Sequence, residues 1–116
     1  MAEVEENKNL GETSIGMQPN LAGLLCYFLG FITGLVFYLV EKKNHFVRFH
    51  AMQSMVVFGG LFVINLVLLI VPILGVLVST LLSLLSIVLW VLLMVKAYQG
   101  EYFKLPIAGD IAEKNS

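Results

Sequence analysis

Hydrophobic and polar positions divide this chain into two long apolar runs separated by one polar segment. Leu21 to Val40 is a run of 20 residues without a charge, and Ala51 to Val95 is a second run of 45. The only charged stretch of this region, residues 41–50, lies between them. Uncharged runs of this length are typical of segments that cross a lipid bilayer. We therefore expect the polar segment to mark where the chain leaves the bilayer and enters it again.

The lengths of the runs predict three membrane-spanning helices. Residues 21–40 would form a helix of about 30 Å, the thickness of the hydrocarbon core. A straight helix from Met55 to Val95 would be about 60 Å long, so this run must fold back. The expected break is Pro72-Ile73-Leu74-Gly75, which gives spans at about 51–71 and 74–95. The predicted fold is an all-α integral membrane protein with a membrane domain over residues 17–113 and interfacial segments at 41–50 and 96–109.

The distribution of charges predicts an orientation. Residues 1–16 are polar and acidic, and we expect them to form a disordered tail. Three spans place this tail on one side of the membrane, and the first loop and the carboxyl end on the other. Lysine and arginine then divide as Lys8 alone against six others, which are Lys42, Lys43, Arg48, Lys96, Lys104 and Lys114. The positive-inside rule predicts a multi-pass cell-membrane protein with its amino terminus outside and its carboxyl terminus in the cytoplasm.

Small and weakly polar residues recur at helical spacing in each expected span. They are Gly23, Gly30 and Gly34 in the first, Ser54 and Asn65 in the second, and Ser79, Ser83 and Ser86 in the third. Such residues let helices approach closely, and the Gly30–Gly34 spacing also occurs where membrane helices dimerise. We interpret them as helix-packing residues. The alternatives are self-association through the first span and a pore lined by the polar faces.

Composition and charge argue against several function classes. The hydrophobic content of 59% and the mean hydropathy of +0.90 are typical of integral membrane proteins, and the net charge of −1 gives no basic excess for nucleic acid. Cys26 is the only cysteine, which excludes an internal disulfide. His45 and His50 do not share a helical face, which disfavours a metal site. The spans hold no pair of acid, base or nucleophile, so we expect no enzyme activity and no cofactor.

Two motifs carry a resemblance to a known family. They are Phe46-Val47-Arg48-Phe49-His50-Ala51-x-Gln53-Ser54 and Ala97-x-x-Gly100-x-x-Phe103-x-x-Pro106-x-x-Gly109. From Leu21 to about Glu113, the chain resembles the small prokaryotic membrane-protein family related to the twenty-kilodalton Tic subunit of the chloroplast import translocon. The resemblance implies an all-helical membrane protein and, from the plastid relatives, a role in protein import. Those relatives have four spans where this chain shows three, and the resemblance brings no catalytic residues.

Both motifs fall on the side predicted to be cytoplasmic. We expect Arg48, His50 and Gln53 to meet the carboxyl tail around Tyr102 and Pro106 and to form a docking surface for a partner or for lipid headgroups. Arg48 presents a planar fork that can clamp the tail or a partner. The alternative for Arg48 is simple anchoring to lipid phosphates.

These observations favour a non-enzymatic helper or structural subunit, for example in membrane-protein handling or protein translocation. We expect it to contact membrane lipids and to form a homo-oligomer or bind a membrane-protein partner. The alternative is a small channel or transporter, which would have to be oligomeric because three helices cannot enclose a pore alone.

Overall fold

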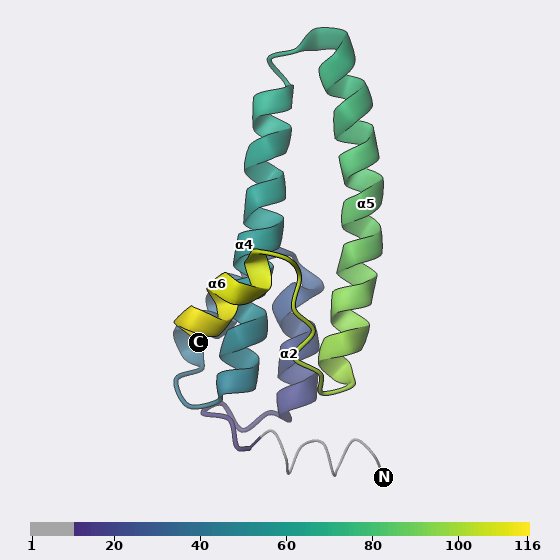
Figure 1. The fold of residues 1–116 in the computed structure, drawn as a ribbon. Helices are drawn as coiled ribbons and strands as arrows, with labels where there is room; N and C mark the ends of the chain where they lie inside the picture. Colours follow the sequence, from purple (N-terminus) through teal and green to yellow (C-terminus); the bar gives the residue numbers. More distant parts are fainter. Residues whose placement is uncertain (1–10) are drawn as a thin grey trace.

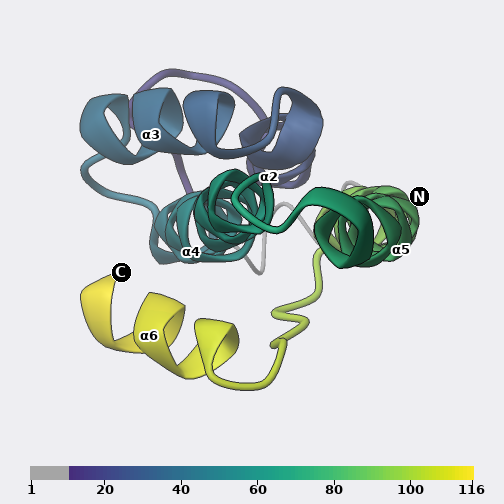
Figure 2. The same ribbon diagram turned by 90° about the horizontal axis from the view of Figure 1, so that it is seen from above.

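The chain is built around two long antiparallel helices, with shorter helices packed near one end. The computed structural model describes residues 11–116, and in these residues it contains five helices. They are α2 (Pro19–Phe28), α3 (Phe31–Val40), α4 (His45–Leu68), α5 (Pro72–Tyr98) and α6 (Ala108–Asn115). The pair α2 and α3 lies on one side of α4, and α6 crosses the opposite side (Figure 1, Figure 2). Helix α4 contacts each of the other four, so it is the centre of the fold.

The first expected span is two helices instead of one. The run from Leu21 to Val40 breaks at Leu29 and Gly30, and α2 and α3 fold against each other as a hairpin. Gly30 has a φ of 65°, a conformation that is inexpensive only for glycine. Each helix has ten residues and is about 15 Å long, half the thickness of the hydrocarbon core. The prediction of one helix over residues 21–40 is therefore wrong, and three transmembrane helices are not confirmed.

Side chains from the long helices satisfy the backbone at this break. The hydroxyl of Ser54 in α4 donates to the carbonyl of Gly30 at 2.8 Å. The indole N–H of Trp90 in α5 donates to the carbonyl of Tyr27 at 2.6 Å. The Thr33 hydroxyl bonds further backbone groups of the same turn. Irregular backbone is tolerated at membrane depth only where protein groups bond it in this way. The hairpin is therefore held at the level of Ser54 and Trp90.

Helices α4 and α5 are the two helices, within the described residues, that are long and apolar enough to cross a membrane. They have 24 and 27 residues, which corresponds to about 36 and 40 Å. The chain reverses between them at residues 69–71, and Pro72 begins α5 close to the expected break. Gly75 is needed at this turn because a Cβ there would overlap the carbonyl oxygen of Leu68.

The amino-terminal residues lie at the same end of the molecule as the first loop. The backbone N–H of Ser14 donates to both carboxylate oxygens of Glu41, at 2.8 and 2.9 Å. The three-span prediction places these two residues on opposite faces of the membrane, and this is wrong. The hairpin returns the chain to the end from which it started, and this is the physical reason for the difference. Residues 1–10 of the expected disordered tail lie outside the described residues, and residues 11–16 run beside this loop.

Two of the three glycines in the first run serve helix packing. A Cβ at Gly23 would lie 2.9 Å from the ring of Phe46, and one at Gly34 would lie 2.9 Å from the backbone oxygen of Ala51. Both glycines therefore let α4 approach the hairpin closely. Gly30 forms the turn, so the three glycines do not share one helical face.

The polar residues of the second half of the chain behave differently from one another. The hydroxyl of Ser79 in α5 donates to the side-chain oxygen of Asn65 in α4, and this pair joins the two long helices. Ser86 bonds the carbonyl of Leu82 in its own helix. Ser83 is exposed on α5. Packing of the helices within one chain therefore uses Ser79 but does not bury Ser83.

Candidate functional site

A buried polar cluster joins α2, α4 and the carboxyl-terminal segment. The cluster consists of Tyr27, His50 and Gln53, whose side chains are fully buried. The Tyr27 hydroxyl donates to Nδ1 of His50 at 2.7 Å, and Nε2 of Gln53 donates to the Tyr27 hydroxyl oxygen at 2.9 Å. Three polar side chains in an apolar interior are inexpensive only if each is hydrogen-bonded. Here every one of them has at least two partners.

The cluster holds the backbone of the tail segment, which we define as residues 99–116. Gln53 donates to the carbonyl of Phe103 at 2.8 Å and accepts from the N–H of Leu105 at 3.0 Å, as a neighbouring β-strand would. Nε2 of His50 lies 2.8 Å from the carbonyl of Glu101. A carbonyl only accepts, so Nε2 of His50 carries a proton, and in the neutral ring Nδ1 then accepts from the Tyr27 hydroxyl. His50 and Gln53 therefore fix the tail segment through three backbone groups.

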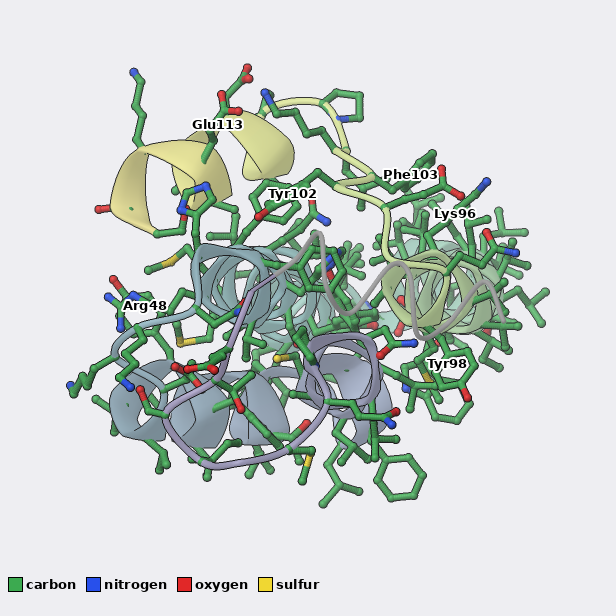
Figure 3. All side chains as sticks on the ribbon, turned by 90° about the horizontal axis from the view of Figure 1, so that it is seen from below. Arg48, Lys96, Tyr98, Tyr102, Phe103 and Glu113 are labelled. Carbon is green, nitrogen blue, oxygen red and sulfur yellow. The ribbon has the colours of Figure 1, made fainter. Side chains whose placement is uncertain are left out.

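Tyr102 covers the cluster with its ring. Its centroid lies 5.0 Å from that of Phe46, 5.1 Å from that of Phe49 and 6.4 Å from that of His50, all on one face of α4. Figure 3 shows Tyr102 lying over α4, with Phe103 directed toward Lys96 of α5. Residues 99–107 of the tail segment thus run across the face between α4 and α5, and α6 follows them.

Arg48 lies apart from Tyr102, at the end of α3 (Figure 3). Its guanidinium donates to the carbonyls of Tyr38 and Glu41 at 3.0 and 2.8 Å, and it stacks over the Tyr38 ring at 4.1 Å. Its Nε also donates to the backbone oxygen of Ser116 at 3.3 Å. Arg48 thus contacts the far end of the tail segment, whereas we had expected it near Tyr102 and Pro106. The exposed Pro106 lies at the turn before α6.

The expected docking surface is therefore occupied by the chain itself. His50 and Gln53 are buried and their bonds go to the tail segment, so neither presents a free group to a partner in this conformation. Their role toward an external partner or lipid headgroups stays a prediction.

A second polar centre lies in the loop before α4. The Glu41 carboxylate accepts from the N–H groups of Ser14, Lys43 and Asn44, and Asn44 in turn caps α4 by accepting from the N–H of Val47. Burial alone would raise the pKa of the Glu41 carboxyl, but the backbone hydrogen bonds outweigh it and lower the pKa from its usual value. Glu41 is therefore an ionised group that ties the amino-terminal residues to this loop.

The sequence reasoning missed Tyr27, Glu41 and Trp90. Tyr27 and Trp90 lie inside apolar runs, where an aromatic residue is usual, and their polar atoms meet partners far away in the chain. Glu41 lies beside two lysines in the charged stretch 41–50, where a solvated charge is usual. No signal in the local sequence distinguishes these three residues, because each role depends on the hairpin that brings the partners together.

The described residues hold no group of three or more histidine, cysteine, aspartate or glutamate side chains that could bind a metal ion. The cysteine at position 26 is buried. The side-chain oxygen of Asn20 is buried without a hydrogen-bond partner, although its amide nitrogen donates to the carbonyl of Tyr98. The arrangement is suited to holding the tail segment in place.

Comparison with known proteins supplies the family. Residues 12–112 match the magnetosome magnetite crystal formation protein family. The chain belongs to this family. It is 50% identical over 107 residues to a UPF0132 membrane protein of Methanocaldococcus jannaschii, covering 92% of this chain and 96% of the relative. It is also 47% identical over 98 residues to a UPF0132 membrane protein of Archaeoglobus fulgidus, covering 84% and 95%. No solved structure matches the chain.

The family match has two consequences for the predictions. The relatives are named membrane proteins and two helices can cross a bilayer, so the chain is a membrane protein of this family. None of the comparisons links it to the translocon subunit, and that resemblance is not confirmed. The matched residues include the α2–α3 hairpin and the tail segment as far as α6, so both belong to the part of the chain that the family shares.

Proposed function

We propose that the chain is a non-enzymatic structural protein of the cell membrane that serves as a subunit of a membrane assembly. The proposal rests on the hydrogen-bond partners of the buried cluster. Tyr27, His50 and Gln53 are the groups most suited to chemistry, and their hydrogen bonds go to each other and to the tail segment. Groups used in this way stabilise a fixed shape, which is what a structural subunit supplies.

Both described ends of the chain are proposed to lie on the cytoplasmic side. The two candidate spans cross the membrane once each, and the amino-terminal residues and the tail segment meet at one end of them. Six of the seven lysine and arginine residues are at this end, whereas residues 69–71 at the opposite turn carry no charge. The positive-inside rule then places the charged end in the cytoplasm.

The family description concerns magnetite crystal formation in magnetosomes. The proposed role of this chain is in the membrane, because its two candidate spans and its family relatives are those of a membrane protein. Membrane-protein handling remains one such role, in which the partner would be another membrane protein.

A small oligomeric channel is the second candidate. One observation favours it, since the hydroxyl-bearing Ser83 and Thr80 are exposed on α5 and would meet a second copy in an assembly. Ion flux measured in proteoliposomes separates the two candidates. A structural subunit gives the flux of empty vesicles, whereas selective flux that Ser83→Leu abolishes would overturn the proposal in favour of a channel.

Thiol labelling in intact cells tests the orientation. In a Cys26→Ala background, single cysteines are placed at Thr13, Ser116 and Ile70, the last being 80% exposed at the turn between the spans. An impermeant reagent added outside should modify the cysteine at position 70 only. Labelling at position 13 without labelling at position 116 would instead restore the three-span topology.

Crosslinking in native membranes tests the subunit role. A photo-crosslinking residue at the exposed position 83 should give an adduct of defined mass, either with a second copy or with one membrane protein. The same residue at Ile107, exposed on the tail segment, is the matched control for contacts outside the bilayer. Recovery of monomer only, at both positions, would contradict an assembly.

A further inference from the structure

The α2–α3 hairpin is about half as long as the hydrocarbon core of a bilayer is thick. Its two helices are about 15 Å long, against about 30 Å for the hydrocarbon core. Its turn is bonded to Ser54 and Trp90, and beyond this level α4 continues for 14 residues to Leu68. Figure 1 shows the two long helices extending alone past the hairpin. One end of the molecule therefore contains α2 and α3 beside the two long helices, with α6 across α4, whereas the other end contains α4 and α5 alone.

The outer face of the hairpin is built for lipid. Eight large apolar side chains are exposed on α2, α3 and the turn between them: Leu21, Phe28, Leu29, Ile32, Leu35, Val36, Leu39 and Val40. The run contains no charged residue, and the charged Glu41, Lys42 and Lys43 follow directly at its base. Exposed apolar surface of this extent is stable only against another apolar phase. Its depth matches a single leaflet, so the acyl chains of that leaflet are the occupant that fits it.

The two halves displace different areas of lipid. A helix with its side chains is about 10–12 Å across, which corresponds to a cross-section of about 80–110 Å². The hairpin adds two such sections, about 160–220 Å², to the leaflet that contains it. The other leaflet contains only α4 and α5, and no described helix compensates there.

We propose that the protein is a wedge that binds preferentially to curved membrane and stabilises it. The wide end expands the leaflet on the side of the tail segment, so the favoured membrane bulges toward that side. The direction in the cell rests on the proposed function, which places this end in the cytoplasm. The membrane would then be convex toward the cytoplasm, as in a bud or vesicle that projects into the cell.

The wedge is tested by orientation in vesicles of different size. The full chain with Cys26→Ala and Ser116→Cys is reconstituted into small sonicated and large extruded vesicles of phosphatidylcholine with phosphatidylglycerol. An impermeant thiol reagent, applied before and after detergent, gives the ratio of outward-facing to inward-facing tails. The outer leaflet of a small vesicle is the expanded one, so this ratio should be higher in small vesicles. A fivefold rise corresponds to about 1 kcal/mol. Equal ratios in both sizes would overturn the wedge.

Two matched pairs of substitutions locate the cause in the shape. The double variant Gly60→Trp/Ser83→Trp adds volume to the narrow half. Both positions are exposed, and a Cβ at position 60 would have no neighbour within 4 Å. Leu35→Trp with Leu39→Trp adds the same residues to the exposed face of the wide half. The first pair should weaken the dependence on vesicle size and the second should not. The wedge is wrong if both pairs act alike.

The proposed function and the wedge fail in different ways. The labelling of position 116 in intact cells depends on orientation alone, and the vesicle-size dependence does not require knowledge of the cytoplasmic side. If labelling in cells places both ends in the cytoplasm, but the ratio of outward-facing to inward-facing tails is equal in small and large vesicles, only the wedge is refuted. If the ratio is higher in small vesicles, but labelling in cells places the carboxyl end outside, only the proposed orientation is refuted.

Discussion

Replacing Gln53 by leucine should release the tail segment while leaving the apolar packing of α4 intact. The side chains have similar volume, but leucine cannot bond the carbonyl of Phe103 or the N–H of Leu105. Each such bond contributes about 0.5–1.5 kcal/mol net, so the two together stabilise the bound tail by about 1–3 kcal/mol. This corresponds to a rise of about 5- to 150-fold in the population in which the tail has opened.

Limited proteolysis of the tail segment measures this population, because cleavage tracks the open fraction when opening and closing are fast relative to cleavage. In nanodiscs, Gln53→Leu should accelerate cleavage of the tail segment by the factor given above, whereas α5 should stay intact. Ser83→Ala is the control, since Ser83 is exposed on α5 and none of the bonds described above joins it to the tail segment. If the tail segment is cleaved equally fast in wild type and Gln53→Leu, the cluster does not hold the tail and the structural role assigned to it is wrong.

Three further predictions follow from the remaining contacts. Arg48→Lys should loosen the end of the tail segment and raise its cleavage by protease. The reason is that lysine cannot bond three backbone oxygens and stack on the Tyr38 ring at the same time, as the guanidinium does. Unchanged cleavage in both Arg48→Lys and Arg48→Ala would make Arg48 a simple anchor. Gly75→Ala should lower the melting temperature in detergent, because the new Cβ overlaps the carbonyl oxygen of Leu68 at a cost of about 1–3 kcal/mol. Gly60→Ala is the control and should not lower it, because a Cβ there has no neighbour within 4 Å. Equal melting temperatures of both variants would show that the turn can relax. The folded-state pKa of Glu41 is lowered, so its carboxylate stabilises the fold above the usual value of 4.5 and this contribution is lost as the pH falls through the folded-state pKa. Hydrogen–deuterium exchange at the Ser14 amide should therefore show protection that decreases on acidification in the wild type. Glu41→Ala, which removes both acceptor oxygens, should lack this protection already at neutral pH. A pH-independent protection in the wild type would contradict the assignment.

Local physical chemistry accounts for several features of the fold. The break before α5 followed from Pro72 and from a run too long for one bilayer crossing. Asn44 caps α4 through its side-chain oxygen, as its position before His45 indicates. These features depend on residues close together in the chain, where spacing and side-chain type are sufficient to define the geometry. The contact between the polar segment and the tail followed from the two motifs, although Arg48 bonds a different part of the tail.

The sequence by itself determined that this is a helical membrane protein, because uncharged runs of this length are stable only in a bilayer. It did not determine how the first run crosses. Twenty apolar residues can form one full span or two half-spans, and their hydropathy is the same in both. The tertiary structure decided this through partners distant in the chain, since Ser54 and Trp90 satisfy the backbone opened at Gly30. That one turn moves residues 11–16 to the same end as the tail segment, and it makes the molecule wide at that end and narrow at the other.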